Sequence, residues 1–235
     1  MSNKKELILS TYKEKTEIKQ KVFSNTFETF NMLREVLKEL AEEYNAALSK
    51  DMEKPRIKYK DRGKFQVSLK FGGDLLIFSM HTNVYEFDRD HHVWKTKYAR
   101  ASKLNTYSGI INIYNFLSDS FKYNRFSDLG YLIGRIFINN TKHYFVEGKR
   151  QMGYLYKDFG TKTIDKSALR DIVESALQYI LEFDLLVPQY DQVKIVNVEM
   201  MQTSNQDEMM QTGKRLGFQY NTDDIHGEEA VYSGH

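Results

Sequence analysis

The pattern of apolar positions predicts one long amphipathic helix near the start of the chain. Between residues 15 and 48 apolar side chains recur at alternating steps of three and four, and the segment contains no proline or glycine. This spacing places them on one face of an α-helix. The positions are Phe23, Phe27, Phe30, Leu33, Leu37, Leu40, Tyr44 and Leu48. Such a stripe can pack across its own domain or form a coiled coil between copies, and the sequence leaves both interpretations open.

After Pro55 the hydrophobic period changes from the helical value to two. Residues 65–71 alternate apolar and polar side chains, which is typical of a half-buried strand. Gly72 and Gly73 predict a hairpin turn into a second strand at 75–81. Two further strands are predicted at 132–138 and 143–150. They are joined by the Asn-Asn-Thr-Lys turn, whose residues tolerate left-handed backbone.

Further helices and strands are predicted from less regular hydrophobic patterns. Residues 83–87 and 92–95 suggest another hairpin, and residues 106–124 suggest a helix with Asn112, Asn115 and Asp119 on one face. A second amphipathic helix follows Asp165, which suits an N-cap. A late strand is expected in residues 192–200.

The order of these elements predicts an α+β fold. Sequential hairpins favour a mainly antiparallel sheet with helices packed on one face, preceded by the long N-terminal amphipathic helix. The expected organisation is a helix for packing or dimerisation in residues 1–52, an α+β domain in 53–199 and a polar C-terminal tail in 200–235. The tail contains the motif Glu-Met-Met-Gln-Thr twice, which we interpret as a local duplication.

Composition narrows the class of protein. The chain of 235 residues has 34 basic and 32 acidic residues, which is too even a balance to indicate a nucleic-acid-binding protein by itself. It has no cysteine, so thiol chemistry and thiolate metal sites are excluded and a reducing compartment is favoured. No signal peptide and no long apolar segment is evident, so we expect a cytoplasmic protein without a membrane partner.

Glu147 and Lys149 form the most specific candidate for chemistry. On a strand they share one face, where a carboxylate could hold a divalent metal ion and a lysine could orient an attacking water. The Glu-x-Lys spacing resembles half of the PD-(D/E)XK nuclease pattern. That resemblance implies an upstream aspartate as a second metal ligand, and Asp128 is the available residue. It further implies Mg²⁺ as the cofactor, with Asp128 and Glu147 as ligands.

A second candidate is a line of cations in the segment from Arg56 to Lys64. Basic residues occupy every second position, so an extended chain would project all of them to one side. They are Arg56, Lys58, Lys60, Arg62 and Lys64. Such a line can bind phosphate, a nucleic acid or an acidic partner, and lysine on an edge strand also protects against aggregation.

Two hypotheses for function follow. The first is a non-catalytic cytoplasmic module that binds a ligand or partner and self-associates through its N-terminal helix into a homo-oligomer, with no cofactor expected. The order of its elements looks like that of PAS and GAF sensor domains. Aromatic residues on the predicted strands could line its pocket, namely Phe78, Tyr85, Trp94, Phe137 and Phe145. The alternative is a Mg²⁺-dependent nuclease acting on DNA or RNA.

Overall fold

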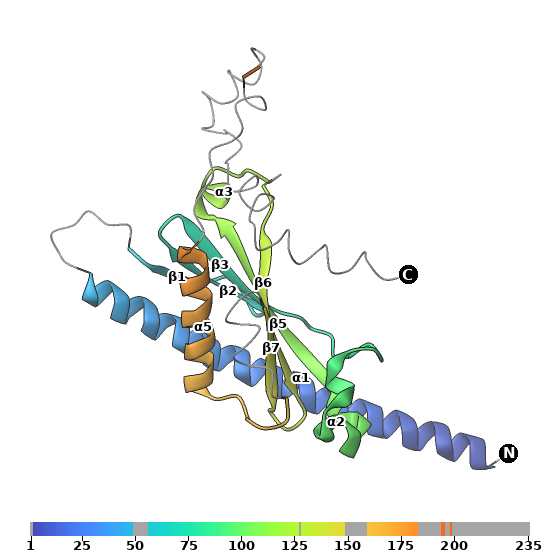
Figure 1. The fold of residues 1–235 in the computed structure, drawn as a ribbon. Helices are drawn as coiled ribbons and strands as arrows, with labels where there is room; N and C mark the ends of the chain where they lie inside the picture. The colour runs from blue at the N-terminus through green and yellow to red at the C-terminus, as the bar shows by residue number, and fades with distance from the viewer. Residues whose placement is uncertain are drawn as a thin grey trace, which may run out of the picture.

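A long helix and an antiparallel sheet make up most of the molecule (Figure 1). The computed structural model describes residues 2–48, 56–126, 128–148 and 159–182, together with 194, 195 and 198. The helices are α1 (Ser2–Ala47), α2 (Lys97–Ala101), α3 (Ser118–Lys122) and α5 (Lys166–Leu181), with 3₁₀ turns η1 (His92–Lys95) and η2 (Lys103–Thr106). The strands are β1 (Lys58–Asp61), β2 (Gln66–Phe71), β3 (Asp74–Met80), β4 (Tyr85–Glu86), β5 (Tyr107–Leu117), β6 (Tyr131–Asn139) and β7 (Tyr144–Gly148).

The sheet is a meander in which neighbouring strands follow one another along the chain. Its order is β1-β2-β3-β5-β6-β7, every pairing is antiparallel, and the short β4 pairs with β5. The hairpin between β2 and β3 turns at Gly72 and Gly73, and Gly72 has a φ of 60°. The α+β prediction with an antiparallel sheet and a preceding helix is therefore confirmed. The N-terminal helix also begins earlier than its apolar stripe, at Ser2.

The predicted helix in residues 106–124 is wrong, because most of that segment is the central strand β5. Ile111 and Ile113 are buried on one face of the sheet, whereas Asn112 is half-buried on the other. Asn115 lies on the buried face, so the polar residues Asn112 and Asn115 are three positions apart and imitate the polar face of a helix. The bulge in the pairing of β5 with β6 leaves out Ile133 of β6 and does not change the alternation along β5. Asn115 is buried and donates from Nδ2 to Asp74 Oδ1 at 3.0 Å.

The predicted hairpin of residues 83–87 with 92–95 is also wrong. Tyr85 and Glu86 pair with β5 instead, opposite Ser108 and Tyr107. Residues 92–95 form η1, which begins after His91, and the Nδ1 atom of His91 accepts a hydrogen bond from the Val93 amide. A local capping interaction therefore replaces strand pairing in this segment.

One face of the sheet, which we call the core face, packs against α1 and α5 in a single hydrophobic core. From α1 the stripe of Phe30, Leu33, Leu37 and Leu40 is almost completely buried. The sheet contributes alternate residues, including Val67, Leu69, Leu76, Phe78, Met80, Ile111, Ile113, Ile136, Ile138 and Val146. The predicted stripe is therefore used for packing across the chain's own sheet.

Glycine allows α1 to approach β5 closely. A Cβ atom at Gly109 would overlap the side chain of Thr26, which is fully buried on α1. Nearby, Asn25 Nδ2 donates to the Asn139 carbonyl at 3.0 Å. These contacts fix the position of the middle of the helix relative to β5 and β6.

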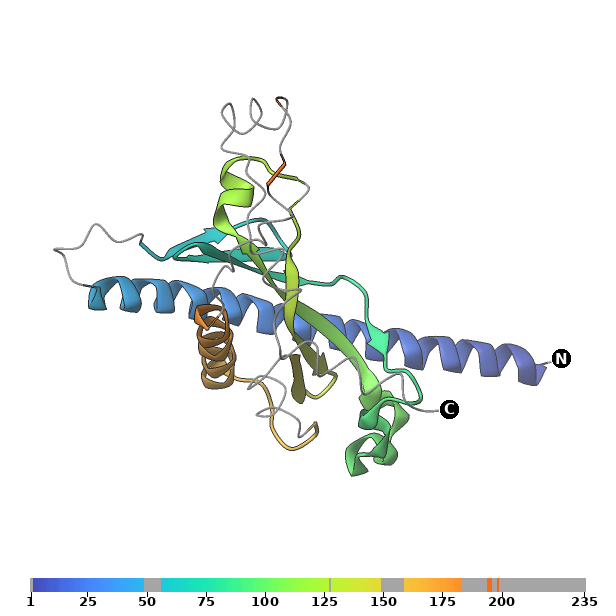
Figure 2. The same ribbon diagram turned by 45° about the horizontal axis from the view of Figure 1, so that its top comes forward.

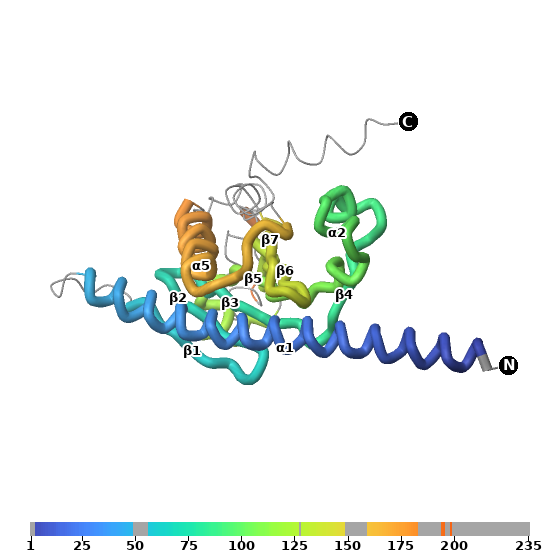
Figure 3. The backbone as a smooth tube through the Cα atoms, turned by 90° about the horizontal axis from the view of Figure 1, so that it is seen from below, coloured from blue at the N-terminus to red at the C-terminus, as the bar shows by residue number. Residues whose placement is uncertain are grey.

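Helix α5 packs against α1 (Figure 3). Asp165 caps its N-terminus by accepting from the Ala168 amide at 2.8 Å, as predicted. Ion pairs join the two helices at their exposed edge, from Lys166 to Glu39 at 2.6 Å and from Arg170 to Glu43 at 2.8 Å. Hydrogen bonding to Glu39 raises the pKa of Lys166, so its ammonium form is favoured.

The first turns of α1 extend beyond the sheet (Figures 1 and 2). Residues 3–15 are all exposed, and burial becomes regular only from Val22 onward. The predicted late strand at 192–200 lies almost entirely outside the described residues, and the repeated motif of the tail lies wholly outside them. None of the described helices is both long enough and apolar enough to cross a membrane.

Candidate functional site

The sheet face opposite α1, which we call the open face, carries polar and aromatic side chains. Strand alternation places Ser79, Asn112, Arg135 and Glu147 side by side across four strands, since each is the register partner of the next. All four are exposed or half-buried. The open face is therefore where the described residues present hydrogen-bonding groups on a rigid support.

A small aromatic cluster covers one end of the open face. Phe137 from β6 and Phe145 from β7 stack with ring centroids 4.6 Å apart. Val93, Ala99 and Phe159 bury them from above. The segment of η1 and α2 thus forms a cap on this face, in addition to the helices packed on the core face.

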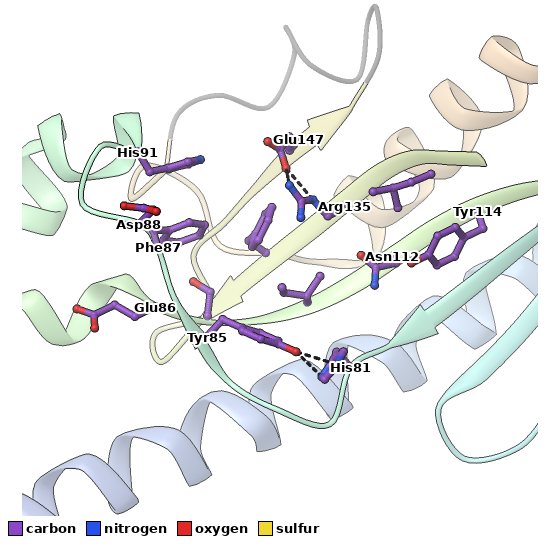
Figure 4. A pocket seen from close by; sticks show the side chains of 14 residues that line it. His81, Tyr85, Glu86, Phe87, Asp88, His91, Asn112, Tyr114, Arg135 and Glu147 are labelled. Carbon is purple, nitrogen blue, oxygen red and sulfur yellow. Dashed lines mark hydrogen bonds and ion pairs between the residues drawn. The ribbon is translucent and has the colours of Figure 1, made fainter. Parts of the chain in front are cut away.

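Between this cap and the open strands lies a cavity of about 440 Å³ (Figure 4). Its floor is formed by Asn112 and Tyr114 of β5 and by Arg135 of β6, and its wall by the segment from Tyr85 to His91. Segments distant in sequence therefore meet here. The volume falls within the range of small-molecule sites in proteins.

Arg135 and Glu147 form an ion pair at the edge of this cavity (Figure 4). Arg135 Nε donates to Glu147 Oε2 at 2.7 Å, and a terminal guanidinium nitrogen donates to the same oxygen. The guanidinium also lies 5.4 Å from the ring centroid of Phe137. Since Oε1 of Glu147 takes no part in these bonds, the pair offers both acceptors and donors to a ligand.

Two histidines lie on the wall of the cavity. Burial, together with the neighbouring His92, lowers the pKa of His91, so its neutral form is favoured near pH 7. Its Nδ1 acts as an acceptor for the Val93 amide, which leaves Nε2 as the protonated nitrogen. His81 is hydrogen-bonded to the Tyr85 hydroxyl, with a distance of 2.8 Å to Nε2.

The aromatic residues that were predicted to line one pocket lie in several parts of the structure. Tyr85 and Phe137 line the cavity. Phe78 is fully buried in the main core, whereas Phe145 belongs to the aromatic cluster of the cap. Trp94 is half-buried and donates from Nε1 to the Phe87 carbonyl at 3.2 Å.

The predicted metal ligands Asp128 and Glu147 have separate partners. Asp128 accepts from Ser120 Oγ at 2.6 Å and pairs with Arg125 at 3.1 Å, beside α3. Glu147 pairs with Arg135 of β6. At about 3.3 Å per residue, Arg135 lies about 13 Å along the strand from its first residue, Tyr131. Asp128 lies before that first residue, at the far end of the strand from Arg135. A shared metal ion would require both carboxylates to leave these cations. Lys149 lies outside the described residues.

The predicted line of cations does not project to one side throughout. Lys58, Lys60 and Arg62 point to the open face, since Tyr59 between them packs toward α1. Lys64 lies over the Phe27 ring of α1 at 5.5 Å and so faces the other way. Arg56 precedes β1 and is exposed. The chain turns at Gly63, whose φ is 114°, and this turn breaks the line.

Sequence reasoning missed Asn112 and Tyr114 as site residues because it assigned them to a helix. The signal that could have found them is composition, since residues 107–117 are rich in isoleucine and tyrosine, which favour strands.

Among the described residues, no three His, Asp or Glu side chains are grouped so that they could hold a metal ion.

Comparisons of this chain with protein-family models, with curated proteins and with solved structures found no match. The chemistry of the site is therefore argued from its own geometry.

Proposed function

We propose that this protein is a non-catalytic ligand-binding module and that the open-face cavity is its binding site. The observation that carries this proposal is the convergence of Asn112, Tyr114, Arg135 and His91 around one volume of about 440 Å³. Rigid strands supply three of these side chains and the cap supplies the fourth. Sites that combine apolar walls with a few convergent polar groups are typical of small-molecule binding.

The lining favours a small polar ligand with a flat or apolar part. Phe87, Phe137 and Tyr114 offer ring surfaces, while the Asn112 amide and the Arg135–Glu147 pair offer hydrogen bonds of both polarities. Neutral His91 adds a donor without adding charge. The absence of cysteine from the sequence supports placing this module in the cytoplasm.

A fragment screen followed by ¹⁵N-detected NMR tests the site without a known ligand. We expect small aromatic fragments with hydrogen-bonding groups to shift the amide signals of residues 85–91, 112–114 and 135. Asn112→Leu should weaken their binding at least fivefold, whereas Asn83→Leu, outside the cavity lining, should not. A cavity that takes up no fragment, or fragments that bind Asn112→Leu equally well, would contradict the proposal.

Self-association through the N-terminal helix is the second part of the proposal. The stripe from Phe30 to Leu40 is occupied by the core, so only the first turns of α1 offer unpaired apolar side chains. Leu7, Ile8, Leu9 and Tyr12 are 55–68% exposed there. Light scattering at micromolar concentration should show an oligomer that Leu9→Glu with Tyr12→Glu converts to a monomer. A monomeric parent protein would contradict this.

A further inference from the structure

Three lysines gather on the open face at the edge of the sheet, away from the cavity. Lys58 of β1 lies directly opposite Lys70 of β2, and Lys60 lies two residues along the same strand and opposite Ser68. Residues at i and i+2 of a strand share a face about 6.7 Å apart, so all three amines project to the same side. Lys58 and Lys60 are exposed and Lys70 is half-buried.

This arrangement leaves positive charge uncompensated. None of the three lysines forms an ion pair with any residue in the described part of the chain. The nearest acidic residue of β1, Asp61, points to the core face and pairs with Arg34 of α1. Like charges directly opposite one another on an antiparallel pair destabilise a sheet. A bound anion would remove that repulsion.

An aromatic ring lies over the same part of the open face. Arg62 Nε donates to Ser68 Oγ at 2.8 Å, and the guanidinium carbon lies 4.8 Å from the ring centroid of Phe121 in α3. Phe121 also makes an edge contact with Phe116 of β5, with centroids 5.2 Å apart. It nevertheless remains 42% exposed. Phe121 is distant from the lysines in the sequence and is brought beside them only by the fold.

We propose that Lys58, Lys60, Lys70 and Phe121 form a binding surface for single-stranded nucleic acid. Lys58 and Lys60 contact phosphates along the edge strand β1, Lys70 contacts a further phosphate from β2, and a base stacks on Phe121, whose ring is held by Arg62 and Phe116. A positively charged track beside an exposed ring is the usual composition of such surfaces. A duplex cannot use the ring without unstacking, and an acidic peptide gains no base stacking from it.

The test measures fluorescence anisotropy of labelled mixed-sequence DNA and RNA oligonucleotides of about 12 nucleotides, within the range of single-strand site sizes. Replacing the three lysines by alanine should weaken binding by more than tenfold. It should also reduce the slope of log K against log salt by about 2, since each phosphate contact contributes about 0.7 for single strands. Phe121→Ala should weaken binding about 5- to 150-fold, the loss of one stacked base, and leave the salt slope unchanged.

A matched variant controls for the loss of net charge. Lys95, Lys97 and Lys103 are exposed lysines on the cap, and replacing these three by alanine should leave oligonucleotide binding within twofold. Equal losses in both triple variants would overturn the proposal. Failure of the parent protein to bind either oligonucleotide at low salt would also overturn it.

Two further probes separate this surface from other interpretations. Heparin carries negative charge without bases, so Phe121→Ala should not affect its binding. If Phe121→Ala leaves oligonucleotide binding unchanged as well, the surface is a general polyanion site and the proposal is wrong. Asn112→Leu, which alters the cavity, should leave oligonucleotide binding intact, so failure here is distinguishable from failure of the proposed ligand site.

Thermal unfolding should show the lysine variant to be at least as stable as the parent, because a cross-strand repulsion is removed.

Discussion

The two faces of the sheet are built from the same strands but meet different requirements. On the core face, alternate residues such as Leu69, Phe78 and Ile113 are completely buried against α1 and α5. On the open face, their neighbours Asn112 and Arg135 stay accessible around a cavity. The difference shows that packing selects the residues of one face, whereas the other face is free to carry polar groups that contribute little to folding.

The two halves of α1 repeat this contrast within one helix. From Val22 onward the helix contributes Phe30 and Leu37 to the core. Before that point, Leu7, Ile8, Leu9 and Tyr12 remain exposed among the described residues. One helix thus stabilises the chain's own domain in one half and presents exposed apolar side chains in the other.

The largest expected effect is the difference in the free energy of unfolding between a substitution on the core face and one on the open face. Phe78→Ala removes a fully buried ring from the core face and should lower the free energy of unfolding by about 3–5 kcal/mol. Leu132→Ala removes a 42% exposed side chain from the open face and should cost less than about 1 kcal/mol. Denaturation in guanidinium chloride measures both. Comparable losses would mean that the open face is covered and contributes to the core.

The sequence predicted the fold better than the site, for a physical reason. Amphipathic periodicity reports burial, so it identified the stripe of α1, the cap of Asp165 and the hairpins of β2–β3 and β6–β7. It failed at β5, where the polar residue Asn115 occupies a buried position and interrupts the alternation of apolar and polar residues.

The site depends on register between distant strands, which a single sequence does not encode locally. The predicted hairpin at Asn-Asn-Thr-Lys brings Glu147 close to Arg135, but nothing in the sequence indicates that Asn112 will be the neighbour of Arg135 on β5. Likewise, the pairing of Lys58 with Lys70 follows from the turn at Gly63 and the register of β1. The predicted line of five cations assumed an extended chain where the backbone turns, so Lys64 was assigned to the wrong side.

An intermediate effect on the stability of the fold is expected when the pH is lowered, because of His91 in the cavity wall. Its pKa in the folded protein is lowered from the ordinary value of 6.5 by burial and by His92. Below about pH 6.5 the unfolded chain therefore binds more protons than the folded one, and stability falls as the pH falls. Protonation also removes the Nδ1 acceptor for the Val93 amide. Stability should therefore be lower at pH 5.5 than at pH 7.5.

His91→Asn isolates this contribution, because asparagine keeps an acceptor at the cap but does not titrate. Thermal unfolding across the same pH range should then show a flatter profile than that of the parent. A parent protein equally stable at both pH values would show that His91 is not the buried neutral group described.

The smallest effect on stability is expected from Glu147, and it also tests the nuclease hypothesis. The Arg135–Glu147 pair is partly exposed, so Glu147→Ala should change the free energy of unfolding by about 0.5 kcal/mol. Asp128→Ala should cost more, since it removes an ion-pair partner of Arg125, whose side chain is only 6% exposed. We expect no cleavage of labelled DNA or RNA by the parent protein with Mg²⁺. Mg²⁺-dependent cleavage that both substitutions abolish would instead show that the two carboxylates leave Arg125 and Arg135 to share a metal ion, and the open face would then be catalytic.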